Sequence, residues 1–183
     1  MNLAAVVLAG GRARRLGGAD KAALEVGGRA LLDRALDAVA QARQVVAVGD
    51  PHPTEREVRW VREQPAYGGP VAATYAGLDA VESADLVVVL AVDMPGVTAA
   101  TVRRLVTAAA RDGSVLVDGG RYHLAFAATP AALARARPAV TQGAAMRDLW
   151  AALDLAPVAA EGMEARDVDE PADLDRTERD PGA

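Results

Sequence analysis

Short apolar runs alternate with helical stretches along the first two thirds of the chain, and this alternation constrains the fold more than any other feature. The runs have the length and composition of buried strands, and the most continuous of them, Leu86–Val92, is expected to be a central strand. The other expected strands are Ala4–Leu8, Gln44–Val48 and Val58–Val61, and the expected helices are Arg29–Ala42, Pro70–Val81 and Thr98–Arg111. Such alternation predicts a doubly wound, largely parallel sheet covered by helices.

The last third of the chain adds an antiparallel element. Asp118-Gly119-Gly120 separates the strand-like runs Val115–Val117 and Arg121–Ala128, which is a hairpin signal. Short helices near Pro130–Arg137 and Gly143–Leu153, an extended Met163–Val168 and a final helix from Pro171 are expected to follow. We therefore predict an α/β, Rossmann-like three-layer fold with a mostly parallel mixed sheet. Residues 1–176 are expected to form one domain and residues 177–183 a frayed tail.

Composition narrows the class of protein. With 183 residues, 51% of them hydrophobic and only 3% aromatic, the chain can fill one core, built mainly of Ala, Val and Leu. A net charge of −5 without a basic stripe argues against a nucleic-acid partner. No run reaches the roughly 18 apolar residues of a membrane span, and no signal-peptide pattern is present. The absence of cysteine fits a reducing compartment, so we expect a cytoplasmic protein.

A glycine-rich loop follows the first expected strand and ends at Lys21, the single lysine among 20 Lys and Arg residues. A lysine kept in so arginine-rich a chain suggests a site that needs a compact point charge. Glycines allow backbone N–H groups to approach phosphate oxygens, while Arg15 and Lys21 would offset the phosphate charge. The spacing matches neither a P-loop nor a dinucleotide fingerprint. Phosphate binding is favoured over a plain surface connection.

Asp93 ends the expected central strand, where ligands of open α/β sheets bind. One interpretation is a ligand of Mg²⁺, which takes one or two protein carboxylates together with phosphate oxygens; the other is a helix or turn cap. The glycine loop at the same sheet edge favours the metal, which Asp169 could also approach. His52, in a proline-flanked loop, is expected to be solvated, and neither it nor His123 has a partner suggesting acid/base work.

Several segments together resemble molybdenum cofactor guanylyltransferases, a branch of the nucleotidyltransferases with a GT-A-type fold. The resemblance covers nearly the whole chain in order. It rests on the glycine loop from Leu8-Ala9-Gly10-Gly11 through Arg15-Leu16-Gly17-Gly18 to Asp20-Lys21, on Gly69-Pro70-Val71-Ala72, on Val92-Asp93-Met94-Pro95, and on Asp167-Val168-Asp169-Glu170-Pro171-Ala172-Asp173-Leu174. After the second strand, where the family usually has Asn, this chain has Gly49-Asp50.

The resemblance implies transfer of GMP from GTP to molybdopterin or molybdenum-molybdopterin, with Mg²⁺ as cofactor and with other proteins of molybdenum cofactor biosynthesis, or its target proteins, as candidate partners. It implies catalytic roles for Arg15, Lys21 and Asp93. The implied nucleotide-binding residues are Leu8, Ala9, Gly10, Gly11, Lys21, Glu63 and Asp93, with Gly69 and Pro70 near the substrate and Asp93 and Asp169 at the metal. The alternatives are another nucleotidyltransferase of this fold, acting with CTP or on a sugar phosphate or phospholactate, and a non-catalytic nucleotide-binding relative.

Overall fold

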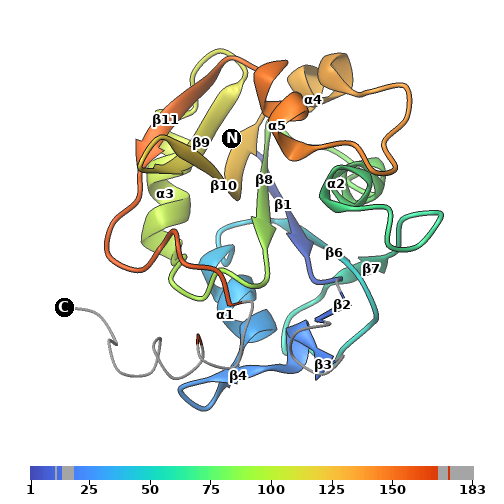
Figure 1. Ribbon diagram of the computed structural model, residues 1–183, viewed down its shortest axis with the longest axis vertical. Coiled ribbons are helices and arrows are strands. Elements are labelled where there is room, and N and C mark those ends of the chain that lie inside the picture. Colours follow the sequence, from blue (N-terminus) through green and yellow to red (C-terminus); the bar gives the residue numbers. More distant parts are fainter. Residues whose placement is uncertain (11, 14–18, 169–172, 174–183) are drawn as a thin grey trace.

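The computed structural model describes residues 1–10, 12–13, 19–168 and 173, and these residues build a seven-stranded sheet between two layers of helices (Figure 1). The strand order is β11-β9-β10-β8-β1-β6-β7. These strands are β1 (Leu3–Leu8), β6 (Gln44–Val48), β7 (Arg59–Val61), β8 (Leu86–Ala91), β9 (Gly113–Asp118), β10 (Arg121–Ala128) and β11 (Leu155–Ala159). The helices are η2 (Lys21–Ala23, a 3-10 turn), α1 (Leu31–Ala38), α2 (Pro70–Asp79), α3 (Ala99–Ala108), α4 (Pro130–Ala136) and α5 (Met146–Ala151).

The sheet is mostly parallel, as predicted. β1 pairs in parallel with both β6 and β8, and β6 with β7, whereas β10 is antiparallel to β8 and β9. The expected central strand is confirmed, because β8 has three strands on either side. The hairpin between β9 and β10 turns at Gly119 and Gly120, both with positive φ.

Helices cover both faces of the sheet, which makes three layers (Figure 1). Alternate residues of β1 point to opposite faces: Ala5 and Val7 belong to the core with α1 and α3, while Ala4 and Val6 belong to the core with α2, α4 and α5. Burial on both faces explains why β1 and β8 are continuous apolar runs.

Two sequence predictions were wrong in the first half of the fold. The helix expected over Arg29–Ala42 is shorter, because Arg29–Ala30 forms strand β5 and pairs with β4 (Glu25–Val26) around a turn at Gly27-Gly28. The sequence also predicts a short extended piece over Ala22–Val26, but only Glu25–Val26 forms a strand, because Ala22 and Ala23 belong to the 3-10 turn Lys21–Ala23.

The end of the chain also departs from the prediction. β11 was not predicted; it is an edge strand paired in parallel with β9, and an edge tolerates Pro157, which has no backbone N–H. Met163–Val168 is not a strand but begins with a turn. Of the helix expected from Pro171 only residue 173 is described, and it is helical; the tail expected over residues 177–183 lies outside the described residues.

The order of connections fixes where a ligand can bind. From β1 the chain builds β6 and β7 on one side, then crosses through α2 to β8 on the other side of β1. The carboxyl ends of β1, β6 and β8 meet at this reversal, which is where open α/β sheets hold their ligands.

Candidate functional site

A cavity of about 400 Å³ lies at the carboxyl ends of β1, β6 and β8. Its floor includes Leu8, Val48 and Ala91 from the ends of these strands. The cavity brings together most of the residues predicted from the sequence, namely Leu8, Gly10, Lys21, Glu63, Gly69, Pro70 and Asp93.

Lys21 and Asp93 form an ion pair inside this cavity. The Lys21 Nζ donates to Asp93 Oδ2 at 2.7 Å, and the two side chains are only 12% and 25% exposed. Asp20 caps the 3-10 turn that carries the lysine, accepting from Ala22 N at 3.1 Å. Asp93 is not the cap of α3, because Thr98 fills that position.

The glycines around the cavity allow two loops to touch. Ala9 N and Gly10 N both donate to Val48 O, at 3.0 and 2.7 Å. Gly49 follows at φ +155°, where a Cβ atom would stand 2.8 Å from Gly10 N. Ala9 itself is buried in the core with α1 and is not a lining residue. The predicted residues Gly11 and Arg15 lie outside the described part of the chain.

One wall of the cavity comes from the loop after β7. Glu63 Oε1 accepts from Tyr67 N at 2.8 Å, which folds the loop back on itself. Tyr67 adopts φ +64° and is 52% exposed at the cavity wall, with the Arg62 guanidinium 5.5 Å from its ring centre. Asp50, at the position near the family's Asn, bonds Arg62 at 2.8 Å and does not line the cavity. Sequence reasoning missed Tyr67, although a tyrosine before two glycines in so aromatic-poor a chain was a usable signal.

A second, larger cavity of about 800 Å³ adjoins the first, and Pro70, Asp93 and Leu124 line both. It combines charged groups of both signs with aromatic surface. The Tyr122 and Trp150 rings meet edge to face, with centres 5.7 Å apart. The charged lining residues of this cavity are Arg121, Arg147, Asp93 and Asp167.

His123 also lines the larger cavity and is 7% exposed. Burial, and secondly the nearby Arg121 charge, lower the pKa of His123 below its ordinary value, so the imidazole is neutral at pH 7. Its Nε2 atom and the Trp150 Nε1 atom are buried without a hydrogen-bond partner among the described residues. Unsatisfied buried polar atoms are rare in folded proteins, and here two of them belong to the lining of one cavity.

The prediction for His52 was wrong. Its side chain is 17% exposed, and its Nε2 lies 2.6 Å from Asp20 Oδ2 while Nδ1 lies 2.8 Å from Asp50 O. His52 thus connects the loop after β6 to the residue before Lys21, a contact between segments that sequence spacing does not reveal.

The oxygen donors at the junction suit a hard cation. Asp93 and Asp167 line the same cavity, and Mg²⁺ favours a site with one or two carboxylates that is completed by substrate phosphates. Asp167 was not singled out from the sequence, and Asp169, which was, lies outside the described residues. The described residues contain no group of three or more potential metal ligands, so a site made wholly of protein ligands is not found among them.

None of the described helices is long and apolar enough to cross a membrane.

The sequence is similar to that of a known protein family. A family model described as the MobA-like NTP transferase domain matches residues 5–158. A molybdenum cofactor guanylyltransferase of Mesorhizobium japonicum is 37% identical over 141 residues, which are 70% of this chain and 67% of that protein. The corresponding enzyme of Cereibacter sphaeroides is 35% identical over 146 residues, 73% of this chain and 72% of that protein.

Two solved structures share the fold. Molybdopterin-guanine dinucleotide biosynthesis protein A from Archaeoglobus fulgidus has a TM-score of 0.75 at 20% identity, covering 96% of this chain and 97% of its own. The 2-C-methyl-D-erythritol 4-phosphate cytidylyltransferase from Thermus thermophilus has a TM-score of 0.71 at 24% identity, covering 98% of each chain. At these identities the likeness concerns the fold alone, and the predicted nucleotidyltransferase architecture is confirmed.

Proposed function

Because this chain belongs to the MobA-like NTP transferase family, we propose that it transfers GMP from GTP to the terminal phosphate of molybdopterin or molybdenum-molybdopterin. The observation that carries the proposal is the pair of adjoining cavities with Asp93 at their junction. A group-transfer enzyme needs two substrate sites that meet where the bond is exchanged. The smaller cavity takes the nucleotide and the larger one takes the acceptor.

The smaller cavity offers the contacts that GTP requires. Lys21 would leave Asp93 to bind a phosphate, while Leu8 and Gly10 border the nucleotide and Ala9 has this role only through the family resemblance. Glu63 supplies a carboxylate that can accept from the guanine amino and imino groups. Tyr67 adds an exposed aromatic face for the base. The roles of Gly11 in nucleotide binding and of Arg15 in catalysis rest on the family resemblance.

The larger cavity suits a planar heterocycle that carries a phosphate. Arg121 and Arg147 provide positive charge for the phosphate, and Tyr122 and Trp150 provide aromatic surface for the ring system.

The chemistry follows from this arrangement. An acceptor phosphate oxygen forms a bond to the α-phosphorus of GTP, and the bond from that phosphorus to the α,β-bridging oxygen breaks, which releases pyrophosphate. The attacking oxygen is already anionic, so no general base is needed. Lys21 neutralises the negative charge that develops on the departing pyrophosphate, and the cavity walls hold the two substrates in line. Asp93, with Asp167 or Asp169, would hold Mg²⁺, which supplies further charge neutralisation at the phosphates.

The test is product identification. The protein is incubated with Mg²⁺, molybdopterin or molybdenum-molybdopterin, and GTP, CTP or ATP in separate reactions, and the dinucleotide is identified by mass spectrometry. We expect the guanine dinucleotide. A cytosine product would assign the chain to a cytidylyltransferase of the same fold, and nucleotide binding without any product would favour a non-catalytic relative.

A further inference from the structure

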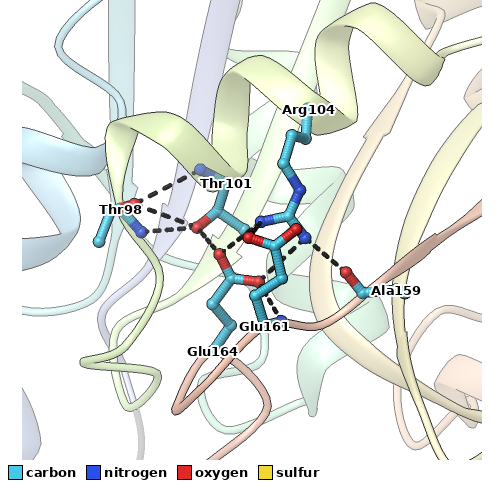
Figure 2. Close-up of polar contacts among 6 residues, drawn as sticks. All are labelled: Thr98, Thr101, Arg104, Ala159, Glu161 and Glu164. Atoms are coloured by element: carbon cyan, nitrogen blue, oxygen red, sulfur yellow. Dashed lines mark hydrogen bonds and ion pairs between the residues drawn. The ribbon is translucent and has the colours of Figure 1, made fainter. Parts of the chain in front are cut away.

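A buried carboxylate outside both cavities joins the two segments that carry Asp93 and Asp167. Glu164 is 7% exposed, and its two carboxylate oxygens accept hydrogen bonds from Thr101, Arg104 and Glu161 (Figure 2). Thr101 Oγ1 donates to its Oε1 at 2.5 Å, and Arg104 donates to both oxygens, at 2.8 and 3.1 Å. Glu161 N completes the set at 2.8 Å to Oε2. Arg104 also forms an ion pair with the Glu161 carboxylate at 3.1 Å, so one guanidinium is shared by two carboxylates, and the four hydrogen bonds offset the cost of burying Glu164.

Thr101 and Arg104, which donate to Glu164, lie on α3, the helix that follows Asp93 in the chain. α3 begins directly after the loop of Asp93, and Thr98 and Thr101 form the capping box that fixes its first turn. The Thr101 hydroxyl accepts from Thr98 N at 3.0 Å and donates to Glu164 (Figure 2). Arg104 also donates to Ala159 O at the end of β11. Glu164 is therefore bonded to the first turn of α3, the helix that follows the loop of Asp93.

Residues 160–168, which we call the strap, run from β11 back to the site. Gly96 packs so closely against the strap that a Cβ atom there would stand 2.3 Å from Met163 O. At the end of the strap, Val168 is 1% exposed and its N donates to Asp93 O at 2.8 Å. Asp167, one residue earlier, lines the larger cavity together with Asp93.

We propose that Glu164 is a positioning residue for the transfer reaction, because it fixes the strap against α3 and so keeps Asp167 in the cavity of Asp93. This inference rests on the proposed function only for the identity of the cation and nucleotide. Residues that orient metal-binding carboxylates typically change metal affinity 10- to 100-fold when mutated. We therefore expect Glu164 to act on Mg²⁺ dependence without touching either substrate.

The test compares two carboxylate-to-amide substitutions. Glu164→Gln keeps the size of the side chain but places an NH₂ group against donors from Arg104 or Glu161. Asp79→Asn is the matched control, because Asp79 also accepts an arginine fork, from Arg137 at 2.8 and 2.6 Å, and lines neither cavity. Two quantities are measured: hydrogen exchange of the Val168 amide, and the Mg²⁺ concentration for half-maximal GMP transfer.

For Glu164→Gln we expect at least about tenfold faster exchange at Val168 and a Mg²⁺ half-saturation raised roughly 10- to 100-fold. Asp79→Asn should change neither. Faster exchange with unchanged Mg²⁺ dependence would overturn the proposal, since Glu164 would then be purely structural, and unchanged exchange would show that the strap does not depend on it.

Two further arms keep the result decisive. If Glu164→Gln does not fold, Arg104→Lys replaces it, since this side chain is 27% exposed and lysine retains the charge while losing the fork. The same two shifts are expected, and their absence would contradict the proposal.

If the parent protein transfers no GMP, the proposed function fails separately. Exchange at Val168 and calorimetric Mg²⁺ binding with α,β-methylene GTP still decide the role of Glu164.

Discussion

Replacing His123 by Leu is expected to stabilise the protein and to weaken acceptor binding at the same time. Leucine has nearly the volume of histidine and brings no polar atom into a site where Nε2 lacks a partner among the described residues. Leaving a buried polar group unsatisfied costs about 1–3 kcal/mol, and the substitution removes that cost. In a chain of 183 residues this corresponds to a rise in melting temperature of roughly 2–12 °C at pH 7.5.

The gain should grow as the pH falls. The pKa of His123 is lowered in the folded protein, chiefly by burial, whereas in the unfolded chain it keeps its ordinary value near 6.5. Below that value the unfolded chain binds a proton that the folded chain does not, so the free energy of unfolding decreases as the pH falls toward the folded-state pKa. The leucine variant lacks this proton uptake and should lose less stability between pH 7.5 and 5.5.

The other histidine provides a control of opposite sign. His52 has both ring nitrogens within hydrogen-bond distance of acceptors, Asp20 Oδ2 and Asp50 O, so His52→Leu should destabilise the fold by about 1–3 kcal/mol. Urea unfolding of the parent and both variants at the two pH values measures these differences.

Kinetics then test the acceptor side. With GTP saturating, His123→Leu should raise the KM for molybdopterin while leaving the KM for GTP unchanged, because His123 lines only the larger cavity. A variant less stable than the parent at both pH values would refute the reasoning from the unsatisfied atom. An unchanged acceptor KM would remove His123 from acceptor binding.

Three further predictions concern the smaller cavity and the junction. Lys21→Ala should raise the activation free energy by roughly 3 kcal/mol, which lowers turnover about a hundredfold, while the melting temperature falls by only a few degrees. Lys21→Arg should also be impaired. Steady-state kinetics and thermal melts check both variants. Asp93→Asn should abolish Mg²⁺-dependent transfer but keep metal-free GTP binding, which a Mg²⁺ titration and calorimetry can separate. Tyr67→Ala should raise the KM for GTP about tenfold and Tyr67→Phe should not, because the ring face rather than the hydroxyl meets the base.

The sequence predicted the parts of the site that depend on strand order. Buried strands are readable as apolar runs, and the residue after such a run must lie at the carboxyl edge of a parallel sheet. The glycine loop that ends at Lys21 and the residue Asp93 were placed at one edge in this way, although the 2.7 Å contact between the Lys21 and Asp93 side chains joins positions 72 apart and is not given by either apolar run.

The features that the sequence did not predict depend on the edge position of a strand, on an unusual backbone angle and on contacts between distant segments. β11 was missed because Pro157 argues against a strand, and only its edge position makes the proline acceptable. Tyr67 reaches the cavity through a left-handed φ, and its position before two glycines, although a usable signal of a special residue, does not give that backbone angle. Asp167 is placed by Glu164, whose partners Thr101 and Arg104 lie about 60 positions earlier in the chain.

The pairing of Lys21 with Asp93 also explains why the single lysine of the chain is found here. A partly buried ammonium or carboxylate is costly alone, and the pair removes that cost when no triphosphate is present. In the proposed reaction the pair must separate, with the ammonium moving to phosphate and the carboxylate to the cation. A lysine holds one carboxylate oxygen through one nitrogen and can exchange it for a phosphate oxygen at little cost. An arginine fork could bind both oxygens of Asp93 and would resist that exchange. Lys21→Arg can therefore preserve the ion pair and the fold and still lose turnover, which distinguishes a lysine selected for release from one selected only for its charge.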